Sequence, residues 1–172
     1  MEPKLTLEFL TDDLGFEKIG KWELKENNIC YNISVESFLG NECALYAFVV
    51  EQKIMYIGKA TFAGLKSRLD RYISIGNTKF TNFRCNTKIK EIITSGNDVL
   101  IYGYIADIHP CGKSKAIKIN LAESLENKLV KILKQQDEAN KNYSWNWTEK
   151  QLERIEKKIE KLSIKSPSKH SE

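Results

Sequence analysis

The sequence predicts an α/β (α+β) fold in which a small, mainly antiparallel three-stranded sheet is flanked by helices. Three runs rich in aromatic and β-branched residues are typical of strands, and they lie at 44–50, 54–57 and 99–106. Apolar residues recur at three- and four-residue steps, as on one face of a helix, over 64–73, 86–94 and 121–134. With 172 residues, 41% of them hydrophobic, the chain is long enough to bury a core.

The first two strands predict a hairpin, because only the polar residues Glu51–Lys53 separate them. Side chains alternate between the faces of a sheet, so the register of this hairpin decides whether Tyr46 and Tyr56 lie together. A two-residue turn would place the two phenols on opposite faces, whereas a three-residue loop or a bulge would place them on the same face. The third strand, 99–106, is expected at the centre of the sheet.

Composition divides the chain into four parts. Residues 1–43 mix short apolar groups with turn-forming residues and predict an acidic, irregular α/β extension. The central domain spans 44–147. Residues 148–163 predict an amphipathic helix that opens with a capping box at Thr148. We expect this helix to pack back on the domain in preference to forming a dimer seam. Residues 164–172 predict a disordered tail.

Basic charge is concentrated in the central domain, which carries 16 basic and 9 acidic side chains. An anionic partner is the natural inference, with a solvated lysine-rich surface as the alternative. No apolar stretch approaches the ~20 residues of a membrane span, and the first residues lack the pattern of a secretory signal. The four cysteines form no CxxC pair, so zinc is not expected. We therefore expect a cytoplasmic protein with reduced thiols.

Five residues of the central domain are the parts that cleavage of a phosphodiester requires: Tyr46, Tyr56, Lys59, Arg68 and Glu126. Hydrolysis needs a base for the attacking water, stabilisation of charge on the phosphoryl oxygens and help for the leaving 3′ oxygen. A carboxylate that holds one Mg²⁺ can supply the last two. A phenol has an ordinary pKa near ~10, so it acts as a base only where nearby cations lower that pKa. Singly, these residues are most often packing or surface residues, and only their ordered combination favours a site.

Ordered motifs extend this constellation over residues 44–147. They are Ala44-Leu45-Tyr46, Tyr56-Ile57-Gly58-Lys59-Ala60, Leu65-Lys66-Ser67-Arg68-Leu69-Asp70-Arg71-Tyr72, Leu125-Glu126-Asn127-Lys128-Leu129-Val130-Lys131 and Trp145-Asn146. Together they resemble the signature of the GIY-YIG nuclease superfamily, and the second motif is particularly similar to the nuclease domain of the bacterial excinuclease C subunit. The resemblance implies a compact nuclease domain that hydrolyses DNA with one Mg²⁺ or Mn²⁺ ion per active site.

The resemblance also implies a role for each matching residue. Tyr46 would be the general base or would orient the attacking water, and Tyr56 would assist by hydrogen bonding to the phosphate or to the water. Lys59 would lower the pKa of Tyr46 or hold the phosphate. Arg68 would stabilise the developing phosphoryl charge, and Glu126 would be the metal ligand.

Asn146 completes the implied set, where it would line the site or support it. The chain departs from the family pattern at Ala44, which stands where the family has glycine. Glu123 lies three residues before Glu126 on nearly the same helix face and is the alternative metal ligand. Asn142 is the alternative to Asn146, because the separation between the glutamate helix and Asn146 is longer than usual.

Basic and amide side chains near these motifs are the expected DNA contacts. Over 81–88 they alternate around Phe83, which suits contacts to phosphates and base edges. A polar helix start, capped by Asn86 or Thr87, is an equal alternative for this segment. The expected contacts are Lys66, Arg71, Asn82, Arg84, Asn86 and Lys88.

The size of the chain favours a small free-standing enzyme similar to the type II restriction endonucleases of this superfamily, encoded by a bacterium or a phage and acting on double-stranded DNA. One active site cuts one strand, so duplex cleavage favours a homodimer. The alternatives are a repair or phage nuclease that nicks DNA or acts on branched or damaged DNA, a non-catalytic DNA-binding module on the same fold, and a pure interaction protein.

Overall fold

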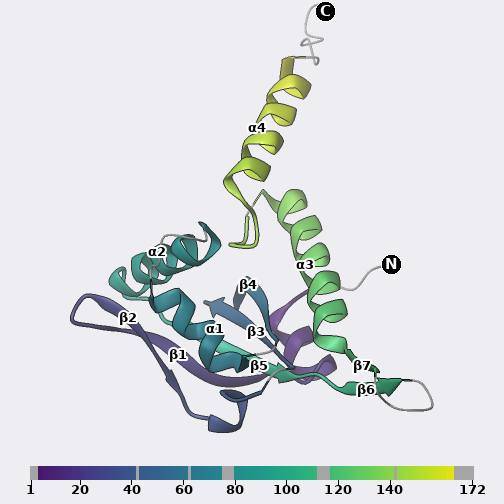
Figure 1. Cartoon of the computed structure of the whole chain (residues 1–172). Coiled ribbons are helices and arrows are strands. Elements are labelled where there is room, and N and C mark those ends of the chain that lie inside the picture. Colours follow the sequence, from purple (N-terminus) through teal and green to yellow (C-terminus); the bar gives the residue numbers. More distant parts are fainter. Residues whose placement is uncertain are drawn as a thin grey trace, which may run out of the picture.

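A five-stranded antiparallel sheet forms the centre of the molecule in the computed structural model, which describes residues 4–41, 43–61, 63–74, 80–111, 117–141 and 143–164 (Figure 1). The strands follow the order β2-β1-β5-β3-β4, and every neighbouring pair is antiparallel. They are β1 (Glu17–Lys25), β2 (Asn28–Ile33), β3 (Ala44–Val50), β4 (Lys53–Ala60) and β5 (Val99–Ile105). The predicted fold class is confirmed, and β5 lies at the centre as expected.

The sheet has five strands rather than the expected three, because the N-terminal region contributes β1 and β2. Strand β1 pairs with the central strand β5, so residues 17–33 are part of the sheet. A bulge between Lys18 and Gly20 shifts the register of β1. As a result the neighbours Ile19 and Gly20 are both buried, and the simple alternation that marks a strand in a sequence is lost.

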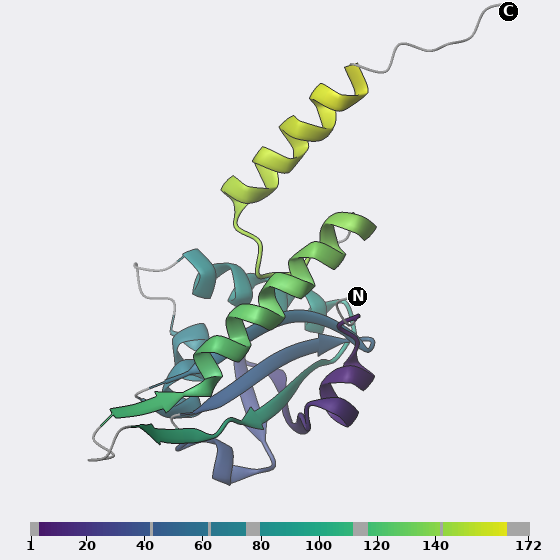
Figure 2. The same ribbon diagram turned by 90° about the vertical axis from the view of Figure 1, so that its right-hand side faces the viewer.

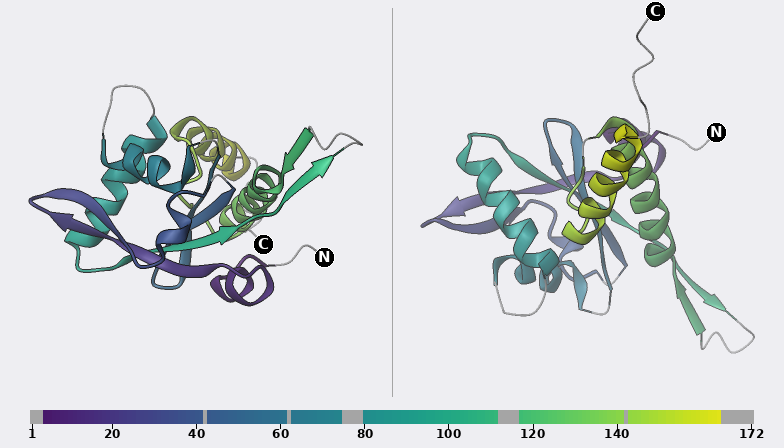
Figure 3. Two further views of the ribbon diagram at one scale, coloured as in Figure 1. Left: turned by 60° about the horizontal axis from the view of Figure 1, so that its bottom comes forward. Right: turned by 90° about the horizontal axis from the view of Figure 1, so that it is seen from above.

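Helices cover both faces of the sheet, with α1 and α2 on one face and α3 and the N-terminal turn on the other (Figures 2 and 3). The helical elements are α1 (Gly64–Ile73), α2 (Phe80–Thr94), α3 (Leu121–Asn140), α4 (Glu149–Ile164) and two short turns at Phe9–Asp13 and Glu36–Phe38. In β3, Tyr46 packs toward α1 while Leu45 packs toward α3. Since both faces are covered, every residue of β3 is buried, which explains its unbroken apolar run.

The sequence located the helices better than it located their ends. Helix α1 has the predicted bounds. Helix α2 begins at Phe80, six residues before the predicted start, so Asn86 lies inside the helix and does not cap it. Helix α3 continues past the predicted end to Asn140, and Lys141 ends it with a left-handed φ of 53°, a common way for a helix to stop.

The hairpin of β3 and β4 combines a two-residue turn with a bulge. Glu51 and Gln52 form the turn with φ values of 47° and 65°, as in the tight turns that suit twisted hairpins. A register shift next to Phe48 then inserts one extra residue, and Phe48 pairs with Tyr56 while Tyr46 pairs with Gly58. The bulge therefore places Tyr46 and Tyr56 on the same face, which confirms the geometric condition set by the sequence.

Two elements project from this body. Strands β6 (Ile108–Cys111) and β7 (Ile117–Asn120) form a separate two-stranded ribbon that extends away from the main sheet (Figure 3). Helix α4 also points away from the sheet (Figures 1 and 2), so the expectation that it packs along the domain is wrong. A hydrogen bond of 3.2 Å from Lys134 Nζ to Gln151 Oε1 connects the first turn of α4 to α3.

Among the described residues, none of the helices has the length and apolar character of a membrane span.

Candidate active site

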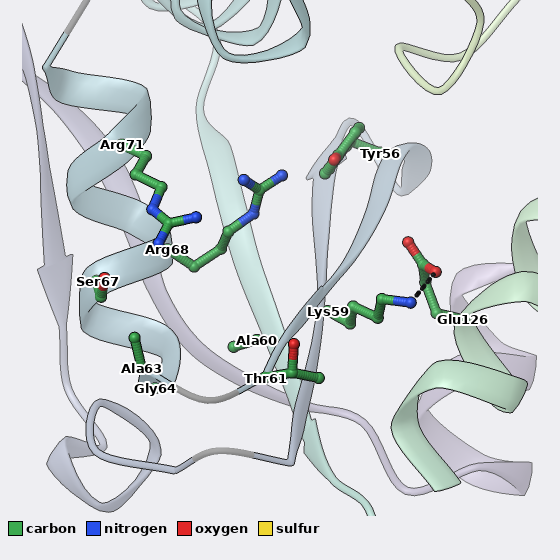
Figure 4. A pocket seen from close by; sticks show the side chains of 10 residues that line it. All are labelled: Tyr56, Lys59, Ala60, Thr61, Ala63, Gly64, Ser67, Arg68, Arg71 and Glu126. Carbon is green, nitrogen blue, oxygen red and sulfur yellow. Dashed lines mark ion pairs between the residues drawn. The ribbon is translucent and has the colours of Figure 1, made fainter. Parts of the chain in front are cut away.

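A pocket of about 220 Å³ opens between α1, the end of β4 and α3 (Figure 4). Its lining residues are Tyr56, Lys59, Ala60, Thr61, Ala63, Gly64, Ser67, Arg68, Arg71 and Glu126. Four of the residues that the sequence singled out for catalysis line it together. They are Tyr56, Lys59, Arg68 and Glu126.

The pocket lies at the edge of the sheet because β4 is the last strand in the order. Alternation along β4 turns Tyr56 toward the α1 layer and its neighbour Ile57 toward the α3 layer. Lys59, two residues after Ile57, follows Ile57 to the α3 side, where its side chain reaches Glu126. Side chains from both faces of β4 therefore meet around one exposed edge.

Arg68 is held in the pocket wall by a network of buried phenols. Its Nε donates to Tyr46 Oη at 2.9 Å, and its guanidinium lies 5.0 Å from the centre of the Tyr72 ring. Tyr46 Oη and Tyr72 Oη are 2.6 Å apart, and Arg68 Nη1 donates to Asn82 Oδ1 at 3.4 Å. The arginine is thus oriented from α1, β3 and α2 at once.

The two motif tyrosines lie at different depths. Tyr46 is fully buried below the pocket, whereas Tyr56 is 5% exposed and forms part of its wall. Burial raises the pKa of Tyr46 well above its ordinary value, and the charge of Arg68 only partly opposes this shift. Burial also raises the pKa of Tyr56. The cations near Tyr46 therefore do not produce the lowered pKa that a phenolic base requires.

Tyr72 belongs to the site although sequence reasoning gave it only a packing role. Tyr72 follows Leu65 and Leu69 at helical spacing, so the pattern places it in the apolar stripe of the helix at 64–73. It also lies four residues after Arg68, and residues at this spacing are neighbours on a helix surface. That spacing is the signal by which it could have been found.

Gly58 allows the two motif tyrosines to come together. A Cβ atom at this position would lie 2.5 Å from Cζ and Oη of Tyr46 and 2.8 Å from Cε1 of Tyr56. These separations are shorter than any tolerable contact, so the glycine of the Tyr-Ile-Gly motif is required by the close approach of the rings.

Replacing Gly58 by alanine is expected to lower both stability and the order of the pocket. The added methyl group must displace the Tyr46 ring, and overpacking of this kind costs about 1–3 kcal/mol. Thermal unfolding of Gly58→Ala against Gly40→Ala measures the effect, because a Cβ at Gly40 meets no atom within 4 Å. Equal melting temperatures for the two variants would contradict the close approach of the Tyr46 and Tyr56 rings to Gly58.

Lys59 is shared between two glutamates of α3. Its Nζ lies 2.7 Å from Glu123 Oε1 and 3.5 Å from Glu126 Oε2, the second pair being marked in Figure 4. Burial alone would lower the pKa of Lys59, but the hydrogen bond to Glu123 and the charge of Glu126 raise it, so the lysine stays protonated. The Glu123 side chain is 66% exposed, whereas that of Glu126 is 19% exposed and lines the pocket.

The donors at the pocket fit a single Mg²⁺ ion held mainly by substrate and water. Mg²⁺ is commonly bound through one or two carboxylates together with phosphate oxygens and water, and Glu126 offers one carboxylate across the pocket from Arg68 (Figure 4). The described part of the chain contains no cluster of three or more His, Cys, Asp or Glu side chains that could hold a metal. Of the two candidate carboxylates, Glu126 lines the pocket and Glu123 does not, so Glu126 is the one that would hold such an ion.

Asn146 does not line the pocket but supports it by binding the backbone of β4. Its Oδ1 accepts a hydrogen bond from Ile57 N and its Nδ2 donates to Ile57 O, both at 2.9 Å. Trp145 N also donates to Met55 O at 2.6 Å. The side chain of Asn146 thus completes the open edge of β4 between Tyr56 and Gly58. Its rival, Asn142, lies outside the described residues.

The six expected DNA contacts fall into different environments. Arg71 is exposed and lines the pocket, and Asn82 contacts Arg68. Lys66 and Lys88 are exposed but paired with acidic neighbours on their own helices. Asn86 is buried and donates to Tyr72 O at 2.7 Å, a position that supports α1 and does not offer the amide to DNA.

Arg84, the sixth expected contact, leaves α2 toward the segment that closes the edge of β4. Its Nη2 donates to Trp145 O at 2.5 Å. It is therefore close to the site but does not line the pocket.

The fold is similar to those of two solved structures. A mutant of EndoII of bacteriophage T4 matches with a TM-score of 0.60 at 17% sequence identity, over 76% of this chain and 96% of that one. The restriction endonuclease HPY188I in complex with product DNA matches with a TM-score of 0.53 at 16% identity, over 79% and 82%. No family model and no curated protein matches the chain. The chain therefore shares the fold of proteins that are named as endonucleases.

Proposed function

We propose that this protein is a Mg²⁺-dependent DNA endonuclease of the GIY-YIG type. One observation carries the proposal: Tyr56, Arg68 and Glu126, which come from β4, α1 and α3, line the same pocket (Figure 4). A phenol, a fixed guanidinium and a carboxylate around a space of this size are suited to a phosphodiester and its attacking water. The fold shared with EndoII and HPY188I supports the same conclusion. A non-catalytic DNA-binding module would have no need of the carboxylate opposite the arginine.

The position of each residue around the pocket indicates its role in cleavage. Arg68, fixed through Tyr46, would donate to the phosphoryl oxygens as negative charge develops on them. Tyr56 would hydrogen-bond the attacking water or the phosphate from the pocket wall. Lys59 would add positive charge beside Glu126. Glu126 would hold a Mg²⁺ ion, which would supply positive charge for the phosphoryl and leaving oxygens.

Phenylalanine substitutions test this division of roles between the two tyrosines. Tyr56→Phe removes a hydroxyl at the pocket wall that also interacts with Arg68 and Tyr72, so it is expected to lower kcat about 10²–10⁴-fold and to cost about 1 kcal/mol of stability. Tyr46→Phe leaves the Arg68 Nε donor without its acceptor, so it is expected to lower activity and also cost about 1–3 kcal/mol of stability. Single-turnover cleavage and thermal unfolding of both variants provide the comparison. A fully stable Tyr46→Phe protein that is inactive beside an active Tyr56→Phe would assign the contact with the attacking water to Tyr46 and not to Tyr56.

We further propose a restriction-type role on double-stranded DNA, with two copies acting together on the two strands. The similarity to HPY188I supports this role. The second candidate is a phage-type nuclease that nicks DNA or acts on branched or damaged DNA, and the similarity to EndoII of bacteriophage T4 supports it.

Incubation with plasmid and linear duplex DNA tests both the nuclease activity and the restriction role. Cleavage that requires Mg²⁺ and stops in EDTA is expected, and an absence of cleavage under all conditions would reject the enzyme. Discrete fragments, together with a dimer in gel filtration, would support the restriction role. Nicked circles produced by a monomer would support the second candidate.

A further inference from the structure

Two cations from different helices converge on the segment that closes the edge of β4. Arg84 of α2 donates through Nη2 to Trp145 O at 2.5 Å. Lys134 of α3 places its Nζ 5.0 Å from the centre of the Trp147 ring and donates to Gln151 Oε1 at 3.2 Å. Each charged group is therefore held in place by a carbonyl, an aromatic face or an amide.

These neutral partners fix the two charges without neutralising them. The ion pairs found among the described residues include Lys66 with Asp70 and Lys88 with Glu91, but none that involves Arg84 or Lys134. Burial and the charge of Arg84 lower the pKa of Lys134, as expected for a cation beside a like charge. An anion bound between the two side chains would relieve this repulsion.

The nearby carboxylate of Asp137 offsets only part of the positive charge at Lys134. It is buried, and its Oδ2 accepts from Ser144 N and from Trp147 Nε1, both at 2.8 Å. Asp137 acts electrostatically on Lys53 as well as on Lys134. Asp137 thus acts on two cations, Lys53 and Lys134, and its carboxylate is already hydrogen-bonded within the segment.

The cation pair lies beside the pocket wall. Trp145, whose carbonyl binds Arg84, donates its N–H to the residue before Tyr56, and Asn82, two residues before Arg84, contacts Arg68. Along α3, Lys134 follows Glu126 by eight residues, a rise of about 12 Å. At ~3.4 Å of rise per nucleotide of a strand, this separation corresponds to about three nucleotides.

We propose that Arg84 and Lys134 form a second phosphate-binding subsite, which holds the backbone of the cut strand about three nucleotides from the scissile phosphate. The strand would leave the pocket past Tyr56 and pass over the segment at Trp145–Trp147. This inference rests on the proposed nuclease function and extends it to the path of the substrate. The subsite would position the strand without sequence preference, as phosphate contacts do.

Lys134→Met tests the subsite, because methionine keeps an unbranched side chain beside Trp147 and removes the charge that lies over its ring. Lys131→Met is the matched control, since Lys131 is an exposed lysine one turn earlier on the same helix. Binding of a fluorescein-labelled duplex is measured in EDTA over a series of KCl concentrations. Lys134→Met is expected to bind about threefold to tenfold more weakly and to lower the salt slope by about one unit. It should raise KM with little change in kcat, and Lys134→Arg should restore binding.

A substrate with single neutral methylphosphonates locates the contact. Substitution about three nucleotides from the cut should weaken binding by the wild-type protein and by Lys131→Met but not by Lys134→Met. Equal binding and equal salt slopes for Lys134→Met and Lys131→Met would overturn the subsite while leaving the nuclease intact. A wild-type protein that neither binds nor cuts DNA would overturn the proposed function and the subsite together.

Discussion

Replacing Glu126 by glutamine is expected to lower the rate of DNA cleavage by on the order of 10³-fold or more. Glutamine keeps the size of the side chain but removes the charge of the carboxylate that the pocket offers to a metal. DNA binding measured in EDTA should be unchanged or tighter, because a negative charge near the phosphate is lost. Single-turnover cleavage over a range of Mg²⁺ concentrations, with binding measured separately, distinguishes a lost metal site from lost affinity.

Glu123→Gln is the matched control for this change, since both glutamates lie on α3 and both contact Lys59. Glu123 is mostly exposed, and its lowered pKa reflects the hydrogen bond to Lys59. Exposed ion pairs contribute little, so we expect cleavage to fall about threefold at most. The opposite pattern, an inactive Glu123→Gln beside an active Glu126→Gln, would move the metal to Glu123.

The local motifs of the site could be predicted because the chain builds them from consecutive elements. Strand β3, strand β4 and helix α1 follow one another directly, so spacing alone could place Tyr46, Tyr56 and Arg68 near one another. The sequence also predicted that Tyr46 and Tyr56 share a face only if the hairpin contains a three-residue loop or a bulge. The bulge in β4 meets this condition. Spacing could not show how deeply each tyrosine is buried relative to the pocket. Tyr46 lies on an inner strand below the pocket, whereas Tyr56 lies on the edge strand and reaches the pocket wall.

Tertiary context decided the features that the sequence missed. Strands β1 and β2 come from a segment with mixed charge and a bulge, so their strand pattern is weak until β1 pairs with β5 and β2 pairs with β1. The same limit applies to the expected DNA contacts. Asn86 and Arg84 belong to one polar helix segment, yet one faces the interior and the other the edge of β4. The faces of a helix can be separated by sequence only when apolar residues mark them, and this segment is polar on several sides.

Replacing Arg68 by lysine is expected to lower kcat about 10²–10³-fold, although the positive charge is retained. Lysine has no donor at the position of Nε, so the 2.9 Å bond to Tyr46 Oη is lost. It also lacks the planar group that lies against the Tyr72 ring, and a flexible ammonium replaces a fixed fork of donors. Because the charge is kept, KM and the salt dependence of DNA binding should change little.

Arg71→Lys separates orientation from charge in this experiment. Arg71 lines the same pocket one turn later on α1, but it is exposed. We therefore expect this substitution to change kcat and KM by no more than about threefold, since an exposed arginine acts mainly through its charge. Steady-state kinetics of the two variants on one substrate provide the comparison. If Arg68→Lys is as active as Arg71→Lys, charge alone is sufficient at the phosphate and the buried phenols do not serve to aim the guanidinium. If only Arg68→Lys loses kcat, the fixed geometry of the guanidinium is itself part of catalysis.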